Sequence, residues 1–164
     1  DGVSYVGTEL EDASSKMRGE VGTDVTITVQ RETNGKIETK DYTITREIIH
    51  IESVASQMLE DNIGYIQISS FDEPTYNEFQ QQWDALEAQG AQRMIIDLRN
   101  NPGGLLSVTE SIADMLLGEG AIVTSVDNQG NEDTVYSDQT QETLPIVVLV
   151  NEGSASASEI LIGA

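Results

Sequence analysis

The stretch NEGSASASEI at residues 151–160 follows an apolar run, PIVVLV, at residues 145–150. The apolar run predicts a buried β-strand, and the sequence EILI that begins at Glu159 predicts the start of a helix. A tight turn between a strand and a helix places serine hydroxyls beside backbone N–H groups that have no partner within the helix. An acyl-transfer enzyme needs this combination of a nucleophile and donors for an oxyanion.

A structural interpretation of the same stretch is also open. Ser156 and Glu159 have the spacing of a Ser-x-x-Glu capping box, in which Ser156 is the N-cap of the helix. Because capping serines are far more numerous than nucleophilic serines, the local pattern by itself favours the cap.

The composition is strongly acidic. The chain has 29 Asp+Glu against 8 Lys+Arg, which gives a formal charge of −21, so nucleic-acid binding is not expected. Cysteine is absent, which excludes a thiol nucleophile and a disulfide framework. The single histidine, His50, cannot build a zinc site of the usual His/Cys kind, and we expect no metal and no cofactor. No apolar run approaches the roughly 18 residues of a transmembrane helix.

The first part of the chain predicts a small α+β segment. A short helix is expected to end near Arg18, and residues 25–30 alternate between apolar and polar side chains as a half-buried strand does. The dipeptide Asn34-Gly35 is a strong signal for a hairpin, and residues 41–46 resume the alternation.

The pattern of apolar residues changes near Ile63. Strand patterns alternate with helical stripes of apolar residues, which predicts right-handed βαβ crossovers and an α/β fold with a mostly parallel sheet. Sites in such sheets form at the carboxyl ends of the strands. The expected strands are residues 63–68, 93–98, 121–126 and 145–150, and the helical stripes are Tyr76, Phe79, Trp83 and Leu86, then Val108, Ile112, Met115 and Leu116.

The second candidate turn is DLRNNPGG at residues 97–104, which follows one of these strands. Glycines there allow positive φ, so the backbone can present N–H groups to an anion. A plain strand-to-helix turn is the alternative. Asp97 and Arg99 are candidates for a structural ion pair, but as neighbours on a strand they are expected to point to opposite faces. Arg99 is therefore expected either to tie down a loop or to contact a substrate.

The two turns together, DLRNNPGG and VNEGSASASEI at residues 150–160, resemble the C-terminal processing peptidases, also called tail-specific proteases. Residues 17–31 resemble the closing part of the PDZ domain of that family. The resemblance implies part of a PDZ-like domain at residues 1–33, connector strands at 34–62, and the first part of a crotonase/ClpP-like serine peptidase core at 63–164.

The resemblance also implies a function. A serine endopeptidase of this family hydrolyses peptide bonds in protein or peptide substrates through an acyl-enzyme. Carried over residue by residue, the nucleophile is Ser156. The oxyanion hole is formed by the N–H of Ala157 and a glycine N–H from Gly103 or Gly104, of which Gly104 is slightly favoured.

The general base is the departure from the family pattern. The family uses a lysine in a Gly-Lys-Gly-Thr-x-Gln stretch after the serine, a serine–lysine variant of triad chemistry. The lysines of this chain are Lys16, Lys36 and Lys40, and none matches that stretch. Both ends look cut, so we expect a fragment that is inactive by itself, with a homodimer as a possible accompaniment of the unfinished core.

Three alternatives stay open at this point. The chain could belong to a catalytically silent, peptide-binding scaffold in which the Ser156 turn is only structural. It could be a hydrolase that uses His50 as the base, although a surface histidine on a strand is the simpler interpretation. A crotonase-type acyl-CoA enzyme shares the two-loop oxyanion hole, but the PDZ-like segment argues against it. The family and the lack of cysteine favour an extracytoplasmic bacterial protein, secreted or membrane-anchored.

Overall fold

The computed structural model describes residues 3–5, 10–49, 51–138 and 141–164. The chain divides into two compact units, residues 1–50 and residues 51–164, which we call the N-terminal unit and the core unit. The expected connector at 34–62 is shared between them, because its first strand pairs within the N-terminal unit and its last strand pairs within the core unit.

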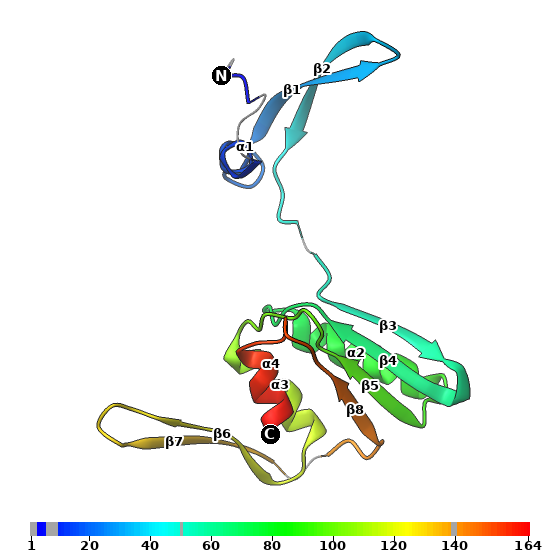
Figure 1. Ribbon diagram of the computed structural model, residues 1–164, viewed down its shortest axis with the longest axis vertical. Helices are drawn as coiled ribbons and strands as arrows, with labels where there is room; N and C mark the ends of the chain where they lie inside the picture. Colours follow the sequence, from blue (N-terminus) through cyan, green and yellow to red (C-terminus); the bar gives the residue numbers. More distant parts are fainter. Residues whose placement is uncertain (1–2, 6–9, 50, 139–140) are drawn as a thin grey trace. The chain divides into compact units, whose positions relative to one another are not determined.

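The N-terminal unit consists of a helix and a hairpin (Figure 1). Helix α1 spans Leu10–Met17, and strands β1 (Asp24–Thr33) and β2 (Lys36–Thr45) pair antiparallel along their whole length. The two-residue turn has φ of 54° at Asn34 and 75° at Gly35, as the primed hairpin turns require. The hairpin predicted from these two residues is confirmed.

Burial in the hairpin is confined to one strand. Alternate residues of β1 are half-buried, as predicted, whereas all of β2 is exposed, so the alternation at 41–46 does not mark a buried face here.

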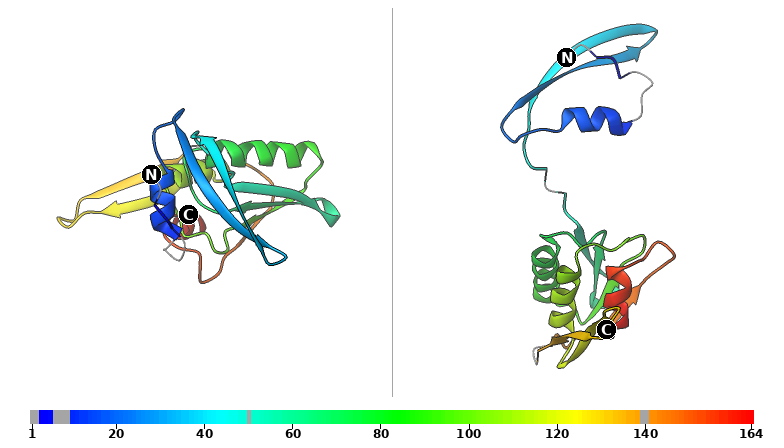
Figure 2. Two further views of the ribbon diagram at one scale, coloured as in Figure 1. Left: turned by 90° about the horizontal axis from the view of Figure 1, so that it is seen from above. Right: turned by 90° about the vertical axis from the view of Figure 1, so that its left-hand side faces the viewer.

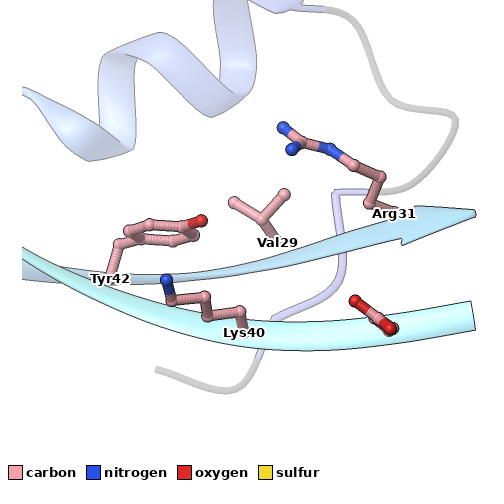
Figure 3. A pocket seen from close by; sticks show the side chains of 5 residues that line it. Val29, Arg31, Lys40 and Tyr42 are labelled. Carbon is pink, nitrogen blue, oxygen red and sulfur yellow. The ribbon is translucent and has the colours of Figure 1, made fainter. Parts of the chain in front are cut away.

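Figure 3 shows a pocket of this unit, with the Lys40 side chain beside the ring of Tyr42. The Lys40 ammonium is 4.8 Å from the centroid of that ring. Val29 and Arg31 line the same pocket.

The core unit contains a four-stranded sheet in the order β3-β4-β5-β8. Strands β4 (Ile63–Ile68), β5 (Arg93–Asp97) and β8 (Ile146–Leu149) are parallel to one another, as predicted. Strand β3 (Val54–Leu59) pairs antiparallel with β4, so the sheet is mixed. The reason is the short 3₁₀ turn at Glu60–Asn62, which returns the chain directly and leaves no room for a crossover helix.

Three helices of the core unit accompany this sheet. Helix α2 (Thr75–Ala88) packs on β3 and β4, and α3 (Leu106–Leu116) contacts both α2 and α4 (Ala157–Gly163) (Figure 2). The predicted apolar stripes lie in the hydrophobic core, with Tyr76 and Met115 at its margin. The largest fully buried side chains include Trp83, Phe71, Phe79, Ile66 and Ile68.

Two strands of the core unit differ from the prediction. Strand β6 (Gly120–Val126) does not join the parallel sheet but forms a separate hairpin with β7 (Glu132–Ser137), which extends from the body of the unit in Figure 1. Asp127 closes this hairpin, since its carboxylate accepts the N–H groups of Gln129 and Asn131 at 2.7 and 2.9 Å. Strand β8 lies at an edge of its sheet, and Val147 is 58% exposed there, so this strand is less buried than its apolar sequence predicts. In the described part of the chain, no helix is long and apolar enough to cross a membrane.

The buried Asp97 carboxylate links β4 to the turn after β5, through a hydrogen bond from Tyr65 and an ion pair with the half-exposed Arg99. Asp97 is fully buried, and its carboxylate accepts hydrogen bonds from the Arg99 guanidinium at 2.6 to 3.0 Å and from the Tyr65 hydroxyl at 2.5 Å. The bonds from Arg99, with help from Tyr65, lower the pKa of Asp97 to about 2 in spite of burial. The bond to Asp97 raises the pKa of Tyr65 above its usual value. Arg99 therefore ties down the turn, as one of the two interpretations of its sequence position expects. The expectation that Asp97 and Arg99 point to opposite faces is wrong, because Arg99 lies two residues on, beyond the end of β5, and its side chain pairs with Asp97.

We predict that the stability of the core unit depends on the Asp97 charge in acid. The pKa of Asp97 is lower in the folded state than its ordinary value of 3.8, so its contribution is complete above about pH 4 and is lost as the pH falls towards 2. Allowing for screening of half-exposed Arg99, the contribution is about 1–2 kcal/mol. Trp83, the single tryptophan, is buried in this unit, so its fluorescence can follow urea unfolding.

The control is Asp97→Asn, which has nearly the same shape and no charge. The difference in unfolding free energy between the wild type and this variant should shrink as the pH falls from 5 to 2. A difference that stays constant over this range would show that the charge of Asp97 does not stabilise the fold.

Candidate active site

The candidate site lies where three parallel strands end. Residues 69–72 follow β4, residues 98–105 follow β5, and residues 150–156 connect β8 to α4. Because the strands are parallel and adjacent, their carboxyl ends lie at one edge of the sheet. The two turns that the sequence singled out therefore lie side by side, and the segment after β4 joins them.

Ser156 has an uncommon backbone conformation for a serine. Its φ is 55° and its ψ is −114°, a region that residues other than glycine rarely adopt. Such strain costs about 1–3 kcal/mol and persists only where neighbouring contacts impose it. The side chain is exposed, and the residue forms the predicted capping box with Glu159, whose carboxylate accepts the Ser156 N–H at 2.8 Å.

Gly103 lies directly against the serine turn. A Cβ on this glycine would be 2.9 Å from the Ser156 Cβ and 3.0 Å from the Ala157 nitrogen. Its φ of 104° also favours glycine. The lack of a side chain at position 103 therefore keeps the space beside the Ala157 N–H open.

Gly104 lies against the segment after β4. Phe71 donates its N–H to the Gly103 carbonyl at 3.0 Å and accepts the Leu105 N–H at 2.7 Å, so its backbone brackets Gly104. A Cβ on Gly104 would be 2.3 Å from the Phe71 carbonyl oxygen, and φ here is 149°. Only glycine fits this position.

Only some of the N–H groups near Ser156 are free to bond to an oxyanion. Gly103 gives its N–H to the side-chain oxygen of Asn101 at 2.8 Å. In contrast, neither the Gly104 N–H nor the Ala157 N–H has an acceptor among the residues that the structure describes. Ala157 is the first residue of α4, where helical geometry leaves the N–H unpaired. An exposed serine hydroxyl and two unpaired N–H groups thus share one corner of the core unit.

Hydrogen bonds between the turns hold this corner together. The Asn101 carbonyl accepts the Ala155 N–H at 3.1 Å, and the Ser154 hydroxyl donates to the Leu98 carbonyl at 2.7 Å. A reciprocal amide pair adds to them: Asn151 accepts the Asn100 N–H at 2.8 Å and donates to the Asn100 side-chain oxygen at 3.0 Å.

Sequence reasoning assigned no role to Asn100, Asn101 or Asn151. The only signal was their position in turns, where asparagine often bonds to nearby backbone. That signal accounts for the local bonds from the Gly103 N–H to Asn101 and from the Gly153 N–H to Asn151. It could not identify the contacts to other segments of the chain.

The candidate bases lie elsewhere in the chain. Lys16, Lys36 and Lys40 are exposed and belong to the N-terminal unit. His50, the candidate histidine base, lies outside the described residues. Within the described ranges, no group of three or more His, Cys, Asp or Glu side chains is arranged to hold a metal ion.

The chain is similar in sequence to several C-terminal processing proteases. The chain is 40% identical to a carboxyl-terminal-processing protease of Synechocystis sp., in an alignment that covers all of this chain and 39% of that protein. It is 37% identical to the carboxy-terminal processing protease CtpA of Bacillus subtilis, of which it covers 35%. The chain thus spans less than half the length of these relatives.

A solved structure has a similar fold. The photosystem II D1 C-terminal processing protease matches 99% of this chain and 46% of its own length, with 30% identity and a TM-score of 0.62. The pattern of peptidase family S41 matches residues 62–164, which include both turns of the candidate site. The chain therefore belongs to peptidase family S41, the family of the C-terminal processing proteases.

Proposed function

We propose that the protein containing this chain is a serine endopeptidase that cleaves protein substrates through an acyl-enzyme, with Ser156 as the nucleophile. The observation that carries the proposal is the strained, exposed Ser156 beside the unpaired N–H of Ala157. Its hydroxyl attacks the scissile carbonyl, and the carbonyl oxygen, which becomes negatively charged, accepts hydrogen bonds from the N–H groups of Ala157 and Gly104. We assign the second donor to Gly104 because the Gly103 N–H is already bonded to Asn101.

The strain at Ser156 argues against a purely structural serine. A residue that only caps a helix takes a relaxed, extended conformation. Ser156 instead has positive φ, although the capping box with Glu159 is formed. A purely structural turn gains nothing from this strain. In a hydrolase, a strained strand-to-helix turn exposes the nucleophile to the substrate.

We further propose that the general base is a lysine outside these residues. A lysine acts as a base only when it is neutral, which requires burial or a nearby positive charge. The three lysines here are exposed on the N-terminal unit, and we propose that this unit is part of a PDZ-like domain that binds substrate peptides.

Replacement of Ser156 by alanine in the full-length protein is expected to abolish peptide hydrolysis while the fold is retained. Ser154→Ala and Ser158→Ala are the matched controls, since each removes one hydroxyl from the same turn. Their hydroxyls bond to the Leu98 and Asn101 carbonyls at 2.7 and 3.0 Å, so each change should cost about 1 kcal/mol of stability and reduce activity far less than Ser156→Ala does. Cleavage of a fluorogenic peptide and thermal unfolding measure both effects, and hydrolysis that survives in Ser156→Ala would exclude the nucleophile assignment.

Residues 1–164 by themselves are expected to show no turnover. A serine hydroxyl is a weak nucleophile without a base, and loss of triad members leaves only about 10³–10⁴-fold acceleration over water. The same fluorogenic assay tests the purified chain, with Ser156→Ala as a control for contaminating protease. Turnover that depends on Ser156 would place the base within these residues, and His50 would be the first to replace.

A further inference from the structure

We propose that Asn101 is the positioning residue that sets both donors of the oxyanion hole. The inference rests on the proposed function, because it concerns how the hole of that peptidase is built. Asn101 is fully buried in the turn after β5 and contacts all three segments of the site.

The side-chain amide of Asn101 sets the first donor. Its Oδ1 accepts the Gly103 N–H at 2.8 Å, and its Nδ2 donates to the Ile68 carbonyl at the end of β4, at 2.9 Å. The Gly103 N–H is thereby turned towards Asn101 and away from the site. The Gly103 carbonyl accepts the Phe71 N–H, so the N–H of the same trans peptide, that of Gly104, points the opposite way and is unpaired at an exposed residue.

The backbone carbonyl of Asn101 sets the second donor. It accepts the Ala155 N–H at 3.1 Å and the Ser158 hydroxyl at 3.0 Å. These two residues flank the pair Ser156–Ala157, so both sides of the strained serine are attached to one oxygen. The position of the Ala157 N–H relative to the glycine turn therefore depends on the same residue as the Gly104 N–H.

The chemistry of the site selects asparagine. The position needs an acceptor for an N–H and a donor for a carbonyl on one short side chain, and only the asparagine amide supplies both at this length. Aspartate would set a carboxylate oxygen against the Ile68 carbonyl in a fully buried place. Alanine would leave the Gly103 N–H and the Ile68 carbonyl unpaired and would free the glycine turn to change its peptide orientation.

The first experiment compares Asn101→Ala with the wild type in the full-length enzyme. An oxyanion donor acts in the transition state, so kcat should fall about 10- to 100-fold while KM changes less than about two-fold. The Ki of a peptide aldehyde, whose adduct with serine places an oxygen in the hole, should rise by the same factor. Active sites are counted with a fluorophosphonate, so that loss of folded enzyme is not mistaken for loss of kcat.

The controls separate this role from simple stabilisation. Ser137→Ala removes a different buried hydroxyl, which bonds to the Gly118 carbonyl away from the site, and should leave kcat per active site and the aldehyde Ki unchanged. If Ser156→Ala is inactive and Asn101→Ala has normal kcat and Ki, the Asn101 inference is overturned and the proposed function stands. If Ser156→Ala keeps its activity, the proposed function itself fails.

Two further measurements apply if Asn101→Ala does not fold. Asn101→Asp has the same size and keeps an oxygen for the Gly103 N–H but loses the donor to the Ile68 carbonyl, and the aldehyde Ki should rise by the same factor by which kcat falls. In the wild type, amide hydrogen exchange should be slow at Gly103 and fast at Gly104, and the aldehyde should slow exchange at Gly104 and Ala157. Slow exchange at Gly104 without the aldehyde, or no effect of the aldehyde on it, would overturn the proposal.

Discussion

Parallel pairing of β4, β5 and β8 is the constraint on which the rest of the core unit depends. The register places Gln67, Asp97 and Leu149 in one row, so three strands stop at nearly the same level. Each strand is followed by a turn whose buried backbone N–H and C=O groups need hydrogen-bond partners. The turns supply these partners to one another, and the candidate site results from this pairing.

Strained residues accumulate in this region because the turns are short. Asn100 and Ser156 have φ of 61° and 55°, and two glycines in the same region have φ above 100°. Hydrogen bonds between the turns offset this cost, and they range from the buried bond of Ser158 to the Asn101 carbonyl to the exposed pair of Asn100 and Asn151. The same bonds give rigidity, and donors that are held in place before the reaction stabilise an oxyanion without reorganising.

Other interactions stabilise the N-terminal unit. Its hairpin is held by the backbone ladder and by polar pairs across the strands, such as Thr28 with Asp41 at 2.7 Å. The Arg46 side chain donates to the Met17 carbonyl at 2.8 Å and so ties α1 to the hairpin. A two-stranded hairpin with little burial is marginally stable alone. None of the residues assigned to the chemistry belongs to this unit.

Much of this architecture could be predicted because local patterns carry it. The spacing of apolar residues was sufficient to predict α2, α3, β4 and β5, and the dipeptide Asn34-Gly35 was sufficient to predict the hairpin turn. The combination of the Pro-Gly-Gly turn with the Ser/Ala turn placed both at one sheet edge. The capping box at Ser156 and Glu159 was also readable from their spacing.

Only the tertiary structure decided which groups are bonded and which are free. The antiparallel partner of β6, the return of β3 onto β4 and the exposure of Val147 depend on neighbours that local periodicity does not specify. The choice between the N–H groups of Gly103 and Gly104 depends on Asn101, which bonds to the Gly103 N–H and is itself held by partners 33 and 57 residues away in the chain. Sequence patterns describe a residue by its neighbours along the chain, whereas a free donor is defined by contacts that form only when distant turns meet.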